Sequence, residues 1–372
     1  MTAFAKNRNV EMVEKLNAEA TSKYNLPPSK MRMNAISLAY CKSNDPLNAE
    51  KVLREMVKAG LRPDAVTYTT VIDAYKRTRN IAKCWELYDY FSTNVGLEGD
   101  GKDADEFLLS YMVRLCAATH DAEKGIRIFN AMEQHGYTRH AMPYNSIIFA
   151  LASSKLYAEK ALEYWHQMHV MNVAPDRHTF VAALKACAQL GDVKTAYDVL
   201  QEMKVQGSPM TEHAYNELIR VYANACAKDS VPEAHIDMYV KDAFELFKSI
   251  EKGQEEGVEV NIHILNSLTF LFTNALRPEQ LESEVLPLYE KYKIRHDVYT
   301  YQHLIKMYLN LRDMEPLMAL WDRMMTKESF QPNQRVLDNV FEGAIRLKSS
   351  DRMVEALEEY VKQKKEPPRF LL

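Results

Sequence analysis

The sequence has little glycine, only 11 residues in 372, and it contains no long apolar run. Scarce glycine together with 19 methionines is typical of a helical rather than a β-rich chain. No apolar stretch approaches the roughly 20 residues that a transmembrane helix needs, so we expect no membrane insertion. A basic excess is also missing, because the formal net charge is −4. Many dedicated nucleic-acid binders are basic, so such a surface here must be local or shared with a partner.

The motifs of common catalytic and cofactor sites are absent as well. The chain has no G-x-G-x-x-G, no G-x-x-x-x-G-K-[ST] and no H-E-x-x-H. A deaminase-type His-x-Glu with Pro-Cys-x-x-Cys is also missing. His166 and His169 share one predicted helix face, but no carboxylate or cysteine stands at ligand spacing from them. We therefore expect a non-catalytic protein with no cofactor and no metal site.

The five cysteines form no C-x-x-C pair, and their number is odd. They are Cys41, Cys84, Cys116, Cys187 and Cys226. Three of them fall near the end of a predicted apolar helix, which favours buried, reduced thiols. That pattern indicates a reducing interior such as the cytosol or an organelle matrix.

An eight-residue segment recurs along the chain, with copies at Val66–Asp73, Met142–Phe149, His213–Arg220 and Tyr299–Lys306. The copies fit a period of about 35 residues, which is typical of stacked supersecondary units. In such a protein each unit packs only on its neighbours. The period therefore indicates an extended binding surface and not a globular domain with one active site.

Residues 177–211 show what one unit contains. Phe180, Leu184 and Cys187 recur at helical spacing and predict a first helix. Gly191 suits a left-handed helix end, and Asp192 suits the N-cap of a second helix. Two helices this short cannot bury both apolar stripes alone, so they must stack on further copies.

The same frame predicts an all-α solenoid of about nine helix-turn-helix repeats. An insertion at 96–101 lengthens one repeat, and extra residues around 227–239 lengthen another. Residues 1–29 match a second helix, so we expect a half-repeat cap there, and 369–372 form a tail. The predicted repeats are 30–64, 65–105, 106–140, 141–176, 177–211, 212–261, 262–297, 298–333 and 334–368.

The segment Gly60–Thr69, the Tyr-Asn/Thr openings and the late methionines of the second helices together resemble the pentatricopeptide repeat family. The resemblance covers about 30–368. It implies an α-solenoid whose first helices line a concave face and which acts on organellar RNA, mitochondrial or plastid. It also implies that one repeat can contact one base through two side chains. These are the fifth residue of the repeat and the last residue before the next repeat.

Several repeats carry residues that resemble the base-reading pairs of the family. Three pairs resemble the uridine-preferring type: Asn34 with Asp64, Asn145 with Asp176, and Asn266 with Asp297. Thr69 with Asp105 resembles the guanine pair, and Asn216 with Asn261 a pyrimidine pair. Ser110 with His140, Val181 with Thr211 and Gln302 with Asn333 depart from the pattern. Asn and Asp are also good helix caps, so the sequence leaves both roles open.

The resemblance also implies base-sandwiching apolar residues at the second position of each repeat, for which Met31, Val66, Phe107 and Met142 are candidates. Cations near the thirteenth position would face phosphates, and Lys42, Arg77 and Arg346 fit. Most other thirteenth positions are uncharged. Because phosphate contacts supply much of nucleic-acid affinity, we expect weak autonomous RNA binding, or RNA held jointly with other proteins.

Two functions remain open. In the first, favoured by the net acidity and the irregular pairs, the chain contacts RNA and ribosomal or other proteins in an organellar ribonucleoprotein. The mitochondrial ribosome of the matrix is the foremost candidate, with a plastid particle as the alternative. In the second, favoured by the three Asn–Asp pairs, the chain alone binds single-stranded organellar transcripts in a sequence-selective way.

Overall fold

The computed structural model describes residues 1–94, 102–119, 121–228, 230–252, 258–326 and 330–363. Within these ranges the ordered elements are helices, and no strand occurs. None of the helices there is both long and apolar enough to cross a membrane. The predicted insertion at 96–101 and the predicted tail lie outside the described residues.

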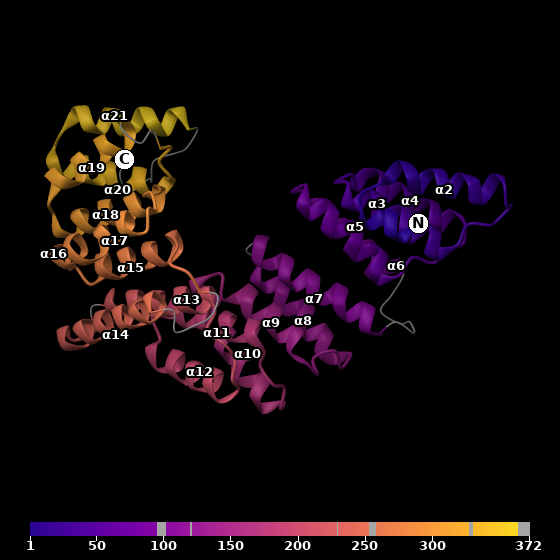
Figure 1. Cartoon of the computed structure of the whole chain (residues 1–372), viewed down its shortest axis with the longest axis horizontal. Helices are drawn as coiled ribbons and strands as arrows, with labels where there is room; N and C mark the ends of the chain where they lie inside the picture. The colour runs from indigo at the N-terminus through magenta and orange to yellow at the C-terminus, as the bar shows by residue number, and fades with distance from the viewer. Residues whose placement is uncertain (95–101, 120, 229, 253–257, 327–329, 364–372) are drawn as a thin grey trace. The chain divides into compact units, whose positions relative to one another are not determined.

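The helices, which are labelled in Figure 1, fall into two compact units. Unit 1 comprises residues 1–153 and 164–174, and unit 2 comprises 154–163 and 175–372. The helices of unit 1 are α1 (Thr2–Lys6), α2 (Val10–Ser22), α3 (Lys30–Lys42), α4 (Pro46–Lys58), α5 (Ala65–Arg77), α6 (Ile81–Asn94), α7 (Lys102–Thr119), α8 (Ala122–Gln134) and α9 (Ala141–Leu151).

Helix α10 (Ala158–Val170) is divided between the units. The elements of unit 2 are η1 (Lys155–Tyr157), α11 (Arg177–Leu190), α12 (Val193–Val205), α13 (Glu212–Cys226), α14 (Glu233–Glu251), α15 (Ile262–Asn274), α16 (Pro278–Gln280), η2 (Leu281–Val285), α17 (Leu286–Lys291), α18 (Val298–Leu311), α19 (Met314–Thr326), α20 (Gln334–Leu347) and α21 (Ser350–Lys362).

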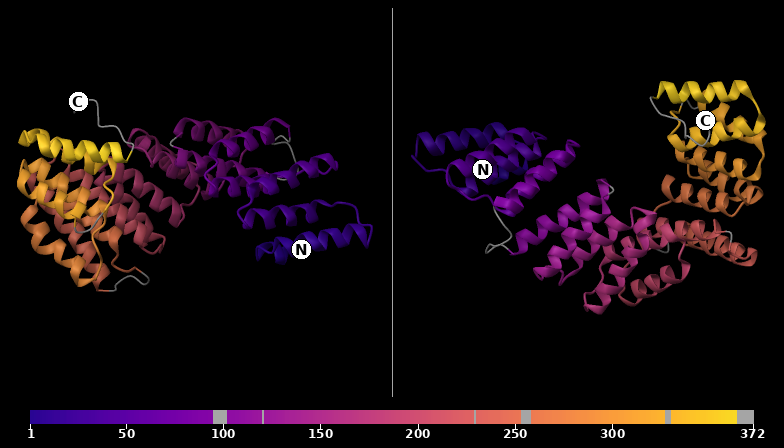
Figure 2. Two further views of the ribbon diagram at one scale, coloured as in Figure 1. Left: turned by 90° about the horizontal axis from the view of Figure 1, so that it is seen from above. Right: turned by 180° about the vertical axis from the view of Figure 1, so that it is seen from behind.

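Helices pair and then stack within each unit. In unit 1, α3 packs on α4 and α5, and α7 packs on α5, α8 and α9. In unit 2, the row of first helices runs through α11, α13, α15, α18 and α20, each in contact with the next (Figures 1 and 2). The second helices α12, α14, α19 and α21 each pack on the first helix that precedes them. This arrangement confirms the predicted all-α solenoid fold.

The amino-terminal residues contain two helices where one was foreseen. Helix α2 includes the predicted segment, and the short α1 precedes it. Both helices pack on α3. Because first helices contact the next first helix throughout unit 1, α1 occupies the place of a first helix.

Local sequence signals set many of the helix ends. Gly191 has φ +59° at the end of α11, and Asp192 caps α12 by accepting from the Thr195 amide, as predicted. Side chains of Asp64, Asp176 and Asp297 cap α5, α11 and α18 in the same way. Acceptors at these caps satisfy amides that lack partners within the helix.

Three elements depart from the regular frame. Helix α7 begins at Lys102, four residues before the predicted start of its repeat at 106. Extra residues of the long repeat extend α14 to 19 residues. The second helix of residues 262–297 is divided into α16, the π-helical η2 and α17. Pro287, which follows η2, has no amide hydrogen to continue an α-helical ladder.

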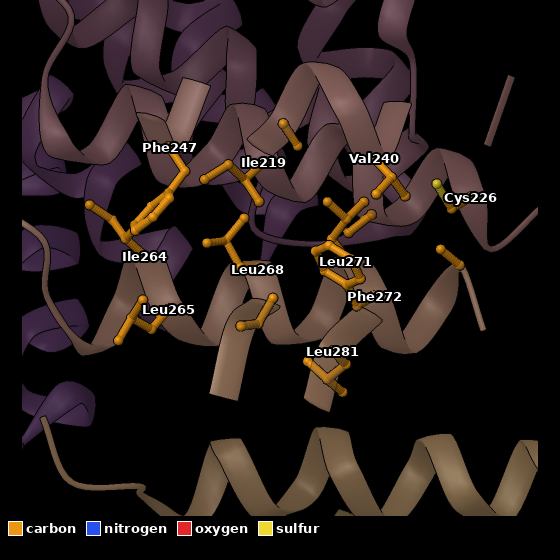
Figure 3. Close-up of a cluster of buried hydrophobic side chains, with 14 of the residues drawn as sticks. Ile219, Cys226, Val240, Phe247, Ile264, Leu265, Leu268, Leu271, Phe272 and Leu281 are labelled. Carbon is orange, nitrogen blue, oxygen red and sulfur yellow. The ribbon is translucent and has the colours of Figure 1, made fainter. Parts of the chain in front are cut away.

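The core of unit 2 is built between its first and second helices. Figure 3 shows Ile219 from α13 and Phe247 from α14 packed with Leu268 and Phe272 from α15. Leu281 of η2 closes the same cluster. All five cysteines of the chain are buried and free, which agrees with the prediction of structural thiols.

Candidate nucleic-acid interface

The predicted pair Asn266–Asp297 is joined by direct hydrogen bonds within unit 2. Asn266 lies in the second turn of α15, and Asp297 is the N-cap of α18. The Asn266 amide nitrogen donates to both Asp297 carboxylate oxygens, at 3.0 Å and 3.2 Å. The main-chain amide of Thr300 donates to Asp297 Oδ1 across 2.9 Å. Asp297 therefore serves both as a helix cap and as a partner of the fifth residue of the preceding repeat.

Hydrogen bonds also fix which way the Asn266 amide faces. Its Oδ1 accepts from the hydroxyls of Thr300 at 2.7 Å and Tyr289 at 3.0 Å. These two bonds use both lone pairs of the oxygen, and at least one Nδ2 hydrogen goes to Asp297. Asn266 can therefore offer a ligand only a donor, whereas Asp297 Oδ2 can still accept.

The pair Asn34–Asp64 in unit 1 has a related geometry. The Thr67 hydroxyl lies 2.9 Å from Asn34 Oδ1 and 2.7 Å from Asp64 Oδ1, so it bridges the two side chains. Thr67 stands in α5 where Thr300 stands in α18, three residues after the capping Asp. Lys30 forms an ion pair with the other Asp64 oxygen at 2.8 Å. A threonine bridge thus orients the fifth-position asparagine in both units.

The remaining predicted pairs have different surroundings. Asp176 caps α11 in unit 2, whereas Asn145 belongs to unit 1, and their pairing stays a prediction. Asn261 caps α15, and Asn216 accepts a hydrogen bond from Ser267. Thr69 is buried and donates to the carbonyl oxygen of Ala65 in its own helix.

Asp105 lies inside α7, not before it. Its side chain is outside the described part of the structure. The Thr69–Asp105 pairing therefore has no structural support and stays a prediction.

The predicted base-sandwiching residues lie at the surface of unit 1. Met31 is 79% exposed, Val66 53% and Phe107 50%. Met142 is half-buried. Large exposed apolar side chains on a row of first helices suit stacking against bases, and this role stays a prediction.

The thirteenth positions make contacts that the sequence did not indicate. Arg77 donates to the carbonyl oxygen of Cys41, Asn224 to that of Ala188, Asn274 to that of Ala223, and Arg346 to that of Leu309, at 2.7–2.9 Å. Each acceptor lies in the last turn of the preceding first helix, where carbonyls lack the regular α-helical donor four residues on. These side chains therefore join neighbouring first helices. Lys42 is exposed.

First helices of unit 2 line a groove of about 820 Å³, which we call the inner groove. Every lining residue comes from α13, α15, α18 or α20, except Asp297 in the connector before α18. The lining residues are Asn216, Arg220, His263, Asn266, Ser267, Phe270, Asp297, Tyr299, Gln302, His303, Lys306, Arg335, Asp338 and Asn339.

The inner groove contains three cations that the repeat pattern did not predict: Arg220, Lys306 and Arg335. Arg220 and Lys306 each stand four residues before a thirteenth position, one helical turn away on the same face. Basic residues at that earlier register indicate Arg220 and Lys306, whereas Arg335 stands at the second position of its repeat. The groove also lies in the part of the chain where the predicted sandwiching and phosphate positions were least favourable.

Within the part of the chain that the structure describes, this is an all-helical repeat protein with a polar groove along its first helices. The family model described as "Pentacotripeptide-repeat region of PRORP" matches residues 88–204 and 177–368. The models "PPR repeat family" and "PPR repeat" match 28–77 and 66–91. The chain belongs to the pentatricopeptide repeat family.

Named relatives are similar over part of their length. A pentatricopeptide repeat-containing protein of Arabidopsis thaliana is 24% identical over 194 residues, 52% of this chain and 26% of the relative. The mitochondrial 15S rRNA processing factor ppr3 of Schizosaccharomyces japonicus is 22% identical over 231 residues, 60% of this chain and 33% of the relative. The chain thus spans about a third or less of either relative.

Solved structures show the same fold. The crystal structure of the pentatricopeptide repeat protein PPR10 in complex with an 18-nt psaJ RNA element matches with a TM-score of 0.54 and 18% identity. That match covers 100% of this chain and 49% of the PPR10 chain. The crystal structure of the pentatricopeptide repeat protein PPR10 from maize matches with a TM-score of 0.53 and 18% identity, over 99% of this chain and 48% of the PPR10 chain. At this identity the likeness shows the fold alone.

Proposed function

We propose that the chain binds single-stranded RNA along its first helices and that it acts without catalysis in organellar RNA metabolism or translation. The observation that carries this proposal is the Asn266–Asp297 pair in the inner groove. Its remaining donor on Asn266 and its free acceptor on Asp297 stand side by side. Uracil offers a carbonyl acceptor and an N–H donor next to each other, so the pair complements its Watson–Crick edge.

The experiment is a binding assay with the purified chain and labelled oligouridylate or oligoadenylate of about ten nucleotides, roughly one per repeat. We expect saturable binding with a preference for uridine. Asn266→Ala should reduce that preference, and Asn266→Thr should shift it towards guanine at the matching nucleotide. Asn310→Ala is the matched control, because Asn310 is exposed and does not line the groove. Equal binding of both oligonucleotides by the unaltered chain would contradict uracil recognition.

The finer proposal is that the chain works inside a mitochondrial ribonucleoprotein such as the mitochondrial ribosome, in the matrix. Two features support it. The net charge of −4 disfavours strong binding to free RNA. Arg77 and Arg346 also donate hydrogen bonds to carbonyl oxygens of neighbouring helices, which leaves fewer donors for phosphates. One relative is also named as a mitochondrial rRNA processing factor. Ribosomal RNA and ribosomal proteins would then be its partners, and a plastid particle is the alternative setting.

The alternative is an autonomous, sequence-selective factor for organellar transcripts, and the cations of the inner groove favour it. Sedimentation of a tagged chain from organelle lysate separates the two proposals. Migration with ribosomal particles that survives brief nuclease trimming of messenger RNA supports the assembly. Migration with light particles, together with tight binding by the purified chain, supports the autonomous factor.

A further inference from the structure

Two cationic side chains of the inner groove have no anionic partner. Lys306 comes from α18 and Arg335 from α20, and both line the groove. Neither forms an ion pair or a side-chain hydrogen bond with any residue that the structure describes. The third groove cation, Arg220 of α13, is paired with Glu217 at 2.8 Å. Lys306 is half-buried, and Arg335 is exposed beside it. Charges that are partly removed from water are normally paired, so Lys306 is suited to an anionic ligand that Arg335 can also reach.

The surroundings of Lys306 also favour a bound anion. Burial lowers the pKa of its ammonium group, and the nearby charge of Arg335 lowers it further. Two carboxylates also line the groove, but each accepts hydrogen bonds from neutral groups: Asp297 from Asn266 and Thr300, and Asp338 from Gln334 and Tyr360. Neither carboxylate forms an ion pair with Lys306 or Arg335 in the described structure. Like charges that lie close together without an ion-pair partner of their own cost free energy. A bound anion would remove that cost.

His303 supplies a second, independent sign of a ligand. Its Nδ1 is buried and has no hydrogen-bond partner among the described residues, although the side chain lines the groove. The ring packs on Phe270, with the centroids 4.9 Å apart. Burial, Lys306 and the arginines lower the pKa of His303 to about 4, so the ring is neutral at pH 7. A buried polar nitrogen without a partner is costly unless a ligand or water reaches it.

The register of the cations indicates which anion fits. Lys306 stands one turn after the fifth-position residue Gln302, and Arg220 one turn after Asn216. Residues four apart on a helix lie about 5–6 Å from each other on one face. Lys306 and Arg220 therefore lie beside the row of base-reading positions, and Arg335 stands at the second position of the next repeat. A strand whose bases face Asn216, Asn266 and Gln302 would bring its phosphates to this second row.

We propose that Lys306 and Arg335, assisted by Arg220 and by a hydrogen bond donated by His303 Nδ1, bind phosphodiester groups of single-stranded RNA in the inner groove. This site rests on the RNA-binding function proposed above. It replaces the predicted thirteenth-position grip in unit 2, where Asn224, Asn274 and Arg346 join neighbouring helices instead.

The test compares three proteins: the full chain, Lys306→Gln and Arg335→Gln. For each, the affinity for labelled oligouridylate of about ten nucleotides is measured at several potassium chloride concentrations. Each lost phosphate contact on a single strand should flatten the slope of log K against log salt by about 0.7. We expect that change in both variants, with roughly a fivefold to tenfold loss of affinity at low salt. Lys194→Gln is the matched control, because Lys194 is exposed on the second helix α12 and should behave like the unaltered chain.

A second probe identifies the contacted group. Oligouridylates that carry one neutral methylphosphonate linkage should bind more weakly to the unaltered chain when the linkage falls in the groove. Lys306→Gln should lose little further affinity from that same linkage. Equal losses in both proteins would overturn the phosphate site.

Folding is checked by thermal melting. Because Lys306 has no partner, its removal should leave the melting midpoint unchanged or raise it, so weaker binding cannot be assigned to unfolding. Wild-type slope and affinity in both groove variants would refute the phosphate site and leave RNA binding standing. No binding by the unaltered chain at low salt would refute the RNA-binding function itself.

Discussion

The guanidinium of Arg346 in α20 donates a hydrogen bond across 2.9 Å to the carbonyl oxygen of Leu309, near the end of α18. Asn274 of α15 makes the equivalent contact with Ala223 of α13, at 2.9 Å. Both contacts satisfy a carbonyl in the last helical turn and join two neighbouring first helices. The thirteenth position therefore contributes to the stacking of repeats, whatever it does towards RNA.

Removal of such a contact should destabilise the stack. Asn274→Ala leaves the Ala223 carbonyl with one donor fewer, and we expect a loss of about 1 kcal/mol in the free energy of unfolding. Asn310→Ala is the matched control, because Asn310 holds the same position in α18 but is exposed. Alanine is the better helix former, so that variant should be neutral or slightly stabilised. Urea denaturation of both variants measures the difference, and equal midpoints would contradict the role of Asn274.

Close packing at the same kind of junction should make Gly191 sensitive to substitution. A Cβ atom there would lie 2.7 Å from the backbone of Asn224 and Ala225, at φ +59°. Backbone atoms cannot move aside as a side-chain tip can, so Gly191→Ala should cost about 3 kcal/mol or more. Gly207→Ala should cost only about 1 kcal/mol, because Gly207 has a similar φ but open space around its Cα. Comparable thermal midpoints for the two variants would contradict the predicted clash.

The features that the sequence predicts well are local. Gly191 ends one helix and Asp192 caps the next, through hydrogen bonds to residues at most five positions away in the sequence. Because these contacts are local, the sequence pattern alone predicts them. Apolar spacing likewise predicts the buried side of each helix, as Phe180 and Cys187 show. These signals, repeated along the chain, are sufficient for the all-α solenoid fold.

The candidate site depends on contacts that leave no such pattern. The acceptor of Asn274 is a main-chain carbonyl, which every residue possesses, so no side chain signals the contact. Lys306 and Arg335 become neighbours only because α18 and α20 stack. The sequence also left open whether each Asp caps a helix or reads a base. Asp297 caps through Oδ1 and leaves Oδ2 accessible to the amide of Asn266, so the two roles are compatible.

Acid should weaken unit 1 through Glu50. Burial alone would raise the pKa of this carboxyl group, but hydrogen bonds from Tyr75, Arg54 and Lys83 outweigh burial and lower it. A carboxyl group whose pKa is lower in the folded chain stabilises the fold above its unfolded value of about 4.3. That contribution disappears as the pH falls through the lower, folded pKa. Acid titration of stability, followed by circular dichroism, should therefore show a loss that begins near pH 4–5.

Substitution isolates the contribution of this group. Glu50→Gln should lower stability at pH 7 by about 2 kcal/mol, because it leaves buried donors poorly paired, and it should flatten the acid transition. Glu86→Gln is the control, since Glu86 also pairs with Lys83 but its side chain is 64% exposed. If Glu86→Gln changed the acid profile as much as Glu50→Gln, the buried network would not be the cause.

Tyr289 should influence RNA recognition without touching RNA. Its side chain is 1% exposed in α17, and its hydroxyl donates to Asn266 Oδ1 across 3.0 Å. Tyr289→Phe removes one of the two donors that keep this oxygen turned away from the groove. We expect a loss of about 1 kcal/mol in stability and a severalfold reduction in the preference for uridine over adenosine. The salt dependence of binding should stay unchanged, because no phosphate contact is lost.

A purely structural role for Tyr289 would lower stability and leave base preference intact. Tyr292→Phe provides the comparison, because it removes a hydroxyl that bonds Glu251 and lies outside the inner groove. Binding of uridine and adenosine oligonucleotides by the two variants, at a temperature where both are folded, separates the possibilities. If the preference for uridine changes in Tyr289→Phe and not in Tyr292→Phe, then Tyr289 of α17 orients the Asn266 amide from the side away from the groove. Base selectivity would then depend on both helices of the repeat. Asn266 of α15 supplies the donor to the base, and Tyr289 of α17, which does not face the groove, fixes the orientation of that donor.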